Sequence, residues 1–226
     1  ISPSGTYGTT FFYLLPYIEQ GNLYTQCNGD SINAGRAVIP GFICPSDPSQ
    51  STPPGGCGQM LGLNVQRDGF GSCSYAANVK VFEPRGTGSL VNQMPDGLSQ
   101  TVMFAERFKN CSPTPSNGGG CTLPAWAWNT IRNGSDPWSS PTFGANTDGI
   151  WQMNAGGADY SNGNVGFQAG PSSAACNWYV TQSGHTSVMM VGLGDGSVRG
   201  VNSGVSVTTW HNACTPNDGI PLGSDW

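Results

Sequence analysis

Residues 186–201 read TSVMMVGLGDGSVRGV, and they carry the strongest local signal for the fold. Residues 186–193 resemble a strand, residues 194–196 a tight turn, and residues 197–201 a returning strand. The Asp-Gly pair supplies the positive φ angles that the turn of a hairpin requires. The sequence therefore predicts a β-hairpin near the C-terminus.

The same turn chemistry recurs along the whole chain. The 226 residues include 34 Gly and 17 Pro, and five Asp and four Asn directly precede a Gly. Gly is about twice as frequent as in an average protein. Strand-like segments at residues 75–82 and 101–104 lie between such turns. Most of the acidic residues are thus expected in turns, in a chain of short strands and loops.

The charge balance excludes several classes of protein. Only 9% of the residues are charged and the net charge is −5, whereas 37% are hydrophobic. Disordered chains combine low hydrophobicity with high net charge, so the chain is expected to fold. Eight Lys and Arg cannot line a nucleic-acid backbone, so no nucleic-acid partner is expected. We predict one α+β, β-dominated domain over residues 1–226, with residues 110–176 as a loop-rich insertion.

The N-terminal segment predicts the one helix in this β-rich pattern. Hydrophobic residues recur at helical spacing from Phe11 to Ile18, and Thr9 or Thr10 precedes them as a capping residue. Gly21 is expected to end the helix. Pro16 lies inside the pattern, where it removes one backbone donor.

The cysteines predict an oxidising, extracellular environment. Eight are dispersed without the spacing of a zinc or redox motif, which favours disulfides over buried free thiols. Cys111–Cys121 and Cys44–Cys57 are the first two pairs expected, because each would close a flexible loop rich in Ser and Pro. The full set of candidates is Cys27, Cys44, Cys57, Cys73, Cys111, Cys121, Cys176 and Cys214.

Catalytic motifs are missing from the sequence, so an enzyme is not expected. There are two His residues, no nucleophile elbow, no phosphate loop and no dinucleotide fingerprint. His185 and Asp195 are separated along one predicted strand by about 30 Å, too far to share a proton or metal. His185 is expected to make a structural hydrogen bond where the strand enters the sheet. Glu106 is the acid expected to be partly buried, as an ion pair or a strand-end carboxylate.

Two kinds of ligand remain open. Ca²⁺ prefers oxygen ligands, and one turn-rich segment offers Asn146, Asp148, Asn154 and Asp159. No other cofactor is expected. Trp126 and Trp128 would point the same way from a strand. Core packing is the favoured interpretation for both, and stacking on a glycan is the alternative.

Six segments together resemble one family, the bacterial prepilin-type proteins with a His-x9-Asp-Gly signature. Here that signature is His185, Asp195 and Gly196. The order of the segments matches that family over nearly the whole chain. The other segments are LLPYIEQ at 14–20 with LY at 23–24, FICPSD at 42–47, SYAAN at 74–78, DGLSQT at 96–101 with Glu106, and TW at 209–210 with GSDW at 223–226.

The resemblance implies a pilin-like antiparallel sheet with a short N-terminal helix, disulfide-stapled loops and a C-terminal hairpin. It implies membrane contact only through an N-terminal hydrophobic helix, which these 226 residues do not include. It transfers no catalytic residue, and the signature residues carry over as structural positions.

Two hypotheses for function follow. The first is a non-catalytic structural protein at the bacterial cell surface or outside the cell. Such a protein would be a subunit of a type IV pilus-like filament, a surface assembly or a type II secretion pseudopilus, with itself or other pilin-like subunits as partners. A lightly charged surface suits dense packing, because little repulsion opposes assembly. The alternative is a secreted carbohydrate- or surface-binding module that uses exposed Trp and loop residues.

Overall fold

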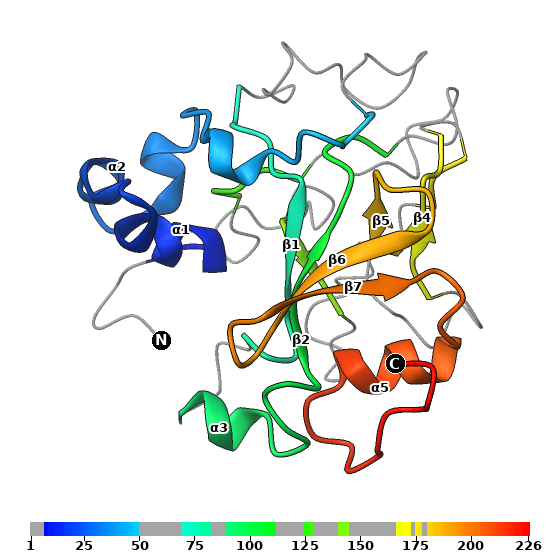
Figure 1. The fold of residues 1–226 in the computed structure, drawn as a ribbon. Coiled ribbons are helices and arrows are strands. Elements are labelled where there is room, and N and C mark those ends of the chain that lie inside the picture. Colours follow the sequence, from blue (N-terminus) through cyan, green and yellow to red (C-terminus); the bar gives the residue numbers. More distant parts are fainter. Residues whose placement is uncertain are drawn as a thin grey trace.

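The hairpin at residues 186–201 forms one side of a five-stranded sheet in the computed structural model of the chain (Figure 1). The structure describes residues 7–49, 69–82, 89–111, 124–128, 140–144, 166–172, 175–177 and 180–226. The strands are β1 (Tyr75–Asn78), β2 (Val102–Glu106), β3 (Thr142–Phe143), β6 (Val188–Leu193) and β7 (Val198–Asn202). Their order across the sheet is β3-β1-β2-β6-β7. The prediction of a β-dominated α+β fold is confirmed.

Three of the four strand pairings in this sheet are antiparallel, as expected, and the fourth is not. β3 runs parallel to β1, with Ala77 opposite Thr142 and Asn78 opposite Phe143. A parallel neighbour requires a long connection, and here the chain between β1 and β3 also contains β2. The sheet is therefore mixed. β1 itself ends at Asn78, four residues before the end of the strand expected from the sequence.

The hairpin has the turn that its sequence predicts. Gly192 lies opposite Val198, the Gly196 N–H donates to the Leu193 carbonyl, and Gly196 has a φ of 84°. Asp195 accepts hydrogen bonds from the N–H and hydroxyl of Ser197 at 2.9 and 2.6 Å. Side-chain bonds of this kind fix a tight turn locally, which is why the sequence alone could place it.

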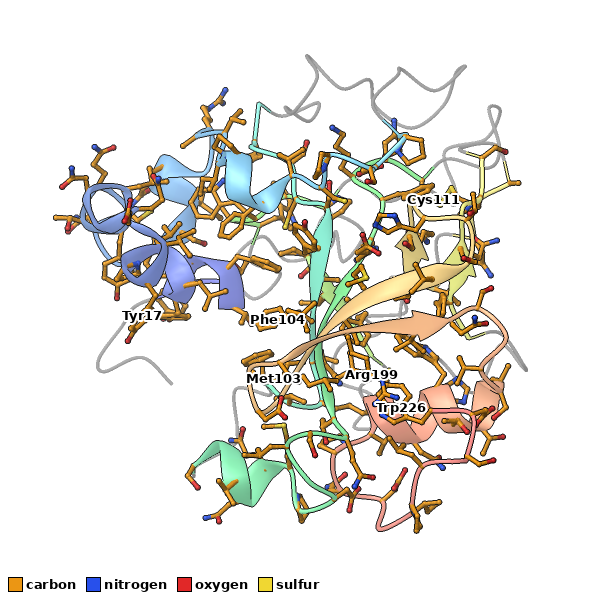
Figure 2. All side chains as sticks on the ribbon, viewed as in Figure 1. Tyr17, Met103, Phe104, Cys111, Arg199 and Trp226 are labelled. Atoms are coloured by element: carbon orange, nitrogen blue, oxygen red, sulfur yellow. A yellow bond between two sulfur atoms is a disulfide. The ribbon has the colours of Figure 1, made fainter. Side chains whose placement is uncertain are left out.

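A β-bulge at Met103 decides which way the rest of β2 faces. Val102 lies opposite Leu193 and Phe104 lies opposite Gly192, so two residues of β2 span one step of β6. Val102 and Ala105 consequently pack on one face of the sheet, and Phe104 packs on the other against the N-terminal helices. Glu106, two residues after Phe104, shares the Phe104 face. Figure 2 labels Met103 and Phe104 at this point of the sheet.

The N-terminal segment covers the Phe104 face of the sheet. Helix α1 (Thr10–Leu14) begins after Thr9, whose hydroxyl accepts from the Phe12 N–H, so the predicted cap is confirmed. The helix tightens into the 3₁₀ segment η1 (Leu15–Ile18), with Pro16 in its first turn. It ends at Glu19, which has a φ of 61°.

The prediction that Gly21 ends the helix is wrong. Gly21 is the first residue of a second helix, α2 (Gly21–Gln26). Glu19 takes the left-handed conformation that usually falls to a Gly at a helix C-terminus. A cluster of aromatic and aliphatic side chains, with Phe11, Phe42 and Trp126 among them, fills the space between these helices and the sheet.

The opposite face of the sheet is covered by α5 (Val207–Cys214), a helix that the sequence analysis missed. Ser206 caps it by accepting from the Thr209 N–H, and Trp210, Ala213 and Cys214 pack against Met189 and Val201. The capping Ser and the helical spacing of Trp210, Ala213 and Cys214 were a usable signal. The sheet is thus a middle layer between two helical layers (Figure 1).

Short elements complete the described part of the chain. They are η2 (Ser31–Ala34), η3 (Pro40–Phe42), α3 (Leu90–Gln93), and the parallel pair β4 (Gln168–Ala169) and β5 (Gln182–Ser183).

One disulfide, Cys111–Cys176, lies in the described residues, and it corrects both pairings expected first. Cys111 does not pair with Cys121, and Cys44 is a free thiol, so it does not pair with Cys57. The sequence favoured short loops, whereas this bond joins residues 65 positions apart. It spans the predicted insertion at residues 110–176 almost end to end.

The other cysteines divide into two groups. Cys57 and Cys121 lie outside the described residues. Four of the eight disulfide candidates are instead buried free thiols: Cys27, Cys44, Cys73 and Cys214.

We expect the variant C111S/C176S to lose about 2–4 kcal/mol of unfolding free energy, because a long loop is no longer closed in the unfolded chain. Denaturant titration under non-reducing conditions measures the loss. Alkylation of the unfolded, unreduced wild-type protein followed by mass spectrometry is the control. It should label Cys27, Cys44, Cys73 and Cys214, and labelling of Cys111 or Cys176 would contradict the pairing.

The C-terminal tail is held at the start of α5 by Asp225. This carboxylate accepts from the Thr209 hydroxyl at 2.6 Å and from the Ser206 N–H at 2.7 Å. The hydrogen bond from Thr209 and then that from Ser206 lower the pKa of Asp225 from 3.8 to about 2.

This lowered pKa predicts a specific loss of stability in acid. Because the folded protein favours the ionised carboxylate, the contribution of Asp225 is complete above the unfolded pKa of 3.8 and is lost as the pH falls towards about 2. The unfolding free energy of the wild-type protein should therefore fall more steeply between these two pH values than that of D225N. Urea titrations at each pH give the unfolding free energy. Equal slopes of this free energy against pH in the two proteins would rule out this role.

Candidate functional site

Glu106 is the centre of a buried polar cluster that gathers residues from four of the family-like segments. It is the last residue of β2, lies opposite Tyr75 of β1, and is 3% exposed. Its neighbours come from the segment at 42–47, from β5 and from the start of the C-terminal hairpin. The prediction that Glu106 is a buried strand-end carboxylate is confirmed.

Both oxygens of this carboxylate are occupied by groups of the protein. Oε2 accepts from the Ser183 hydroxyl at 2.6 Å and from the Met190 N–H at 2.9 Å. Oε1 accepts from the Cys44 thiol at 3.5 Å and lies 3.4 Å from His185 Nε2. A charge removed from water is tolerated only when it is paired and hydrogen-bonded, and here four groups supply that compensation.

His185 lies at the open end of the hairpin, as its position relative to the turn predicts. The register pairs Val188 with Asn202, and His185 precedes this pair while Asp195 lies at the opposite end. The His185 side chain is 37% exposed and reaches the carboxylate of Glu106. The backbone N–H of His185 donates to the Ser183 hydroxyl. The structure therefore separates the two signature residues: one holds Glu106 and the other shapes the turn.

A second buried carboxylate, Asp47, ties the loop at 42–49 to the sheet. Its Oδ2 accepts from the Ser74 hydroxyl at 2.8 Å and from the Lys109 N–H at 3.0 Å. Its Oδ1 accepts from the N–H and the hydroxyl of Ser49. In the sequence, Asp47 stands out only as the last residue of the FICPSD segment. Its link to the sheet was not predictable, because the donors Ser74 and Lys109 are 27 and 62 residues away.

Asn78 ties the C-terminal helix α5 to the sheet, as Asp47 ties the loop at 42–49. Its amide donates to the Val102 carbonyl at 2.8 Å and to the Cys214 carbonyl at 2.9 Å, and its Oδ1 accepts from the Lys80 N–H. The side chain is fully buried. A single amide thus joins β1, β2 and the last residue of α5.

Asp96 fixes the segment that follows α5. Its carboxylate accepts from the N–H groups of Asp218 and Gly219 at 2.8 and 3.0 Å. With Asp47, Asn78 and Glu106, it shows a pattern shared by three of the six family-like segments: each contributes a polar side chain that binds a distant part of the chain.

The free thiols are held in their protonated form. Burial raises the pKa of Cys44, and it raises the pKa of Cys73 to about 12. Burial also raises the pKa of Cys27 and Cys214. A thiolate is the reactive form of cysteine, so these positions suit packing better than nucleophilic chemistry.

Arg107 is a buried cation beside the cluster. Its Nη1 donates to the carbonyls of Ser140 and Thr142 at 3.0 and 2.7 Å, which holds the entry to β3. Nε and Nη2 have no hydrogen-bond partner within the described ranges. Burial lowers the pKa of Arg107 to about 10.

The alternative of a glycan contact is wrong for Trp126, and the expected core packing is confirmed there. Residues 126–128 form a turn and not a strand, and Trp126 is fully buried with its Nε1 donating to the Ala37 carbonyl. Its ring face is therefore unavailable to a sugar. Trp128 is half-buried and packs edge-on against Phe70 at 5.3 Å between ring centroids.

The predicted Ca²⁺ ligands Asn146, Asp148, Asn154 and Asp159 lie outside the described residues. Within the residues that the structure describes, no three His, Cys, Asp or Glu are grouped to hold a metal ion. The same residues include no helix with the length and hydrophobicity needed to cross a bilayer.

The role of Glu106 predicts a clear order of stability among variants. E106Q should cost about 1–3 kcal/mol, because an amide NH₂ would face groups that now donate to the carboxylate. D195N, at the exposed end of the same signature, is the matched control and should cost less, because its bonds lie within one turn. The midpoints of denaturant unfolding measure both, and equal losses would contradict the central role of Glu106.

Comparison with known proteins gives one match. The model of a family described as "Protein of unknown function (DUF1559)" matches residues 2–207. No curated protein matches the chain, and no solved structure matches it. This family is compatible with a surface or pilin-like protein. Since the match spans most of the sequence, the chain belongs to the DUF1559 family.

Proposed function

We propose that the protein is a non-catalytic structural subunit of a bacterial extracellular or cell-surface assembly, of the pilin or pseudopilin kind. The observation that carries this proposal is how the family-like segments use their polar side chains. Asp47, Asn78 and Glu106 direct their oxygen and nitrogen atoms at backbone and side-chain groups of the protein itself. Residues used in this way preserve a shape, and a preserved shape is what a repeating subunit requires.

The low charge of the chain and the disulfide also support this proposal. With 9% charged residues, neighbouring copies meet little electrostatic repulsion. The Cys111–Cys176 bond closes a long segment, and disulfides persist in oxidising compartments outside the cytosol. Membrane attachment through an N-terminal helix and a place in a secretion pseudopilus or type IV pilus are part of the same proposal.

The test is the state of assembly of the protein. We expect the purified chain to self-associate as its concentration rises, giving particles visible by electron microscopy and a rising sedimentation coefficient. The assemblies should withstand mild denaturant and be lost after reduction, because the disulfide maintains the subunit's shape. The matched comparison is C111S/C176S, which should behave like the reduced protein. A wild-type chain that stays monomeric at high concentration would overturn the proposal.

A further inference from the structure

Within the described residues, the outer edge of β7 has no neighbouring strand. β7 is the last strand of the five-stranded sheet, and four of its five residues are exposed, with only Val201 buried. Figure 1 shows β7 at the margin of the sheet, above α5. The exposure of Val198, Gly200 and Asn202 means that neither helical layer extends over this edge.

The register identifies which backbone groups face outward. The Leu193 N–H donates to the Ser197 carbonyl, and the Ser203 N–H donates to the Ser187 carbonyl. Hydrogen-bonded pairs alternate along an antiparallel ladder, so Arg199 and Val201 are the β7 residues that bond to β6. The N–H and C=O groups of Val198 and Gly200 and the N–H of Asn202 consequently point away from the sheet, while the Asn202 carbonyl already accepts from the Val205 N–H at 3.0 Å.

This edge has little of the protection that exposed strands usually carry. Proline, acidic residues and lysine commonly block edge pairing, and β7 (Val198–Asn202) contains none of them. Its one charge, Arg199, lies over the ring of Trp226 at 4.9 Å and so is held on the α5 face (Figure 2). Val198 is 71% exposed, although it is a β-branched hydrophobic residue.

We propose that β7 pairs antiparallel with β7 of a second copy of this chain, around a two-fold axis at Gly200. This rests on the proposed function and names the contact through which two subunits join. The outward groups of Gly200 would bond to those of the second copy's Gly200, and Val198 would lie opposite the second copy's Asn202. Strand addition of this kind gains main-chain hydrogen bonds. The Asn202 carbonyl would accept from the second copy's Val198 through its second lone pair, because the Val205 N–H already occupies the first.

The charge of Arg199 favours the register with its axis at Gly200 over the register shifted to an axis at Arg199. With the axis at Gly200, each Arg199 lies opposite a Val201. An axis at Arg199 would set two guanidinium groups directly across from each other, and like charges at opposed positions are destabilising. A two-fold pair is closed, so growth into a larger assembly uses a further surface on each subunit.

Cysteine cross-linking tests both the contact and its register. V198C and N202C are made as separate variants and then mixed under mild oxidation. Cα atoms of a hydrogen-bonded antiparallel pair are about 5.5 Å apart, which suits a disulfide. Two copies of V198C alone would hold their cysteines about 13 Å apart along the strand.

The mixture should therefore give a covalent dimer, and each variant alone should not. The native free thiols at Cys27, Cys44, Cys73 and Cys214 are buried and do not compete. Equal cross-linking in all three samples, or none in any, would overturn the proposed pairing.

A matched pair of substitutions supplies the second measurement. V198P removes an outward N–H that bonds to nothing within the chain's own sheet, and an edge strand tolerates proline at such a position. V198T keeps both the N–H and the β-branched shape. We expect V198P to weaken dimerisation at least tenfold in sedimentation experiments and V198T to leave it unchanged. Equal dimerisation of V198P and V198T would refute the contact.

The outcomes separate this contact from the proposed function. If V198P still forms the same assemblies as the wild type, the subunit role stands and the β7 contact falls. If the wild type forms cross-linkable dimers and nothing larger, the contact stands and the subunit role falls.

Discussion

The fold of this protein depends on a carboxylate held away from water. Glu106 ends the central strand β2 and is 3% exposed, so its charge has to be balanced inside the protein. The balancing groups come from Cys44 and from one stretch at 183–190, which supplies Ser183, His185 and the backbone of Met190. Because an unpaired buried charge costs several kcal/mol, these segments are held in place together.

The bulge at Met103 is what makes this arrangement possible. In a regular strand, Val102, Phe104 and Glu106 would share one face of the sheet. The extra residue exchanges the faces to which the side chains after Val102 point. Ala105 therefore packs towards α5, while Phe104 and Glu106 face the N-terminal helices. One inserted residue therefore joins the aromatic cluster beneath α1 to the polar cluster around Glu106.

Asp47 and Asn78 extend the same principle to the edges of the fold. Asp47 binds the loop at 42–49 to Ser74, just before β1, and to Lys109, three residues after β2. Asn78 binds the end of α5 to the centre of the sheet. The Cys111–Cys176 bond then closes the long segment between β2 and β5. The chain carries little charge, and in the part that the structure describes the sheet ends at β7 without a further strand.

Local chemistry explains which predictions from the sequence succeeded. The hairpin turn at Asp195 and Gly196, the Thr9 cap and the β-dominated class depend on residues that are close in sequence. The burial of Glu106 followed from the hydrophobic run before it. The disulfide partner of Cys111, the bulge at Met103, the parallel β3 and the burial of Trp126 depend on packing between segments that the chain order does not bring together. The same holds for the partners of Asp47, Asn78 and Glu106: their residue types are visible in the sequence, but the donors they bind become neighbours only when the sheet and its two helical layers form.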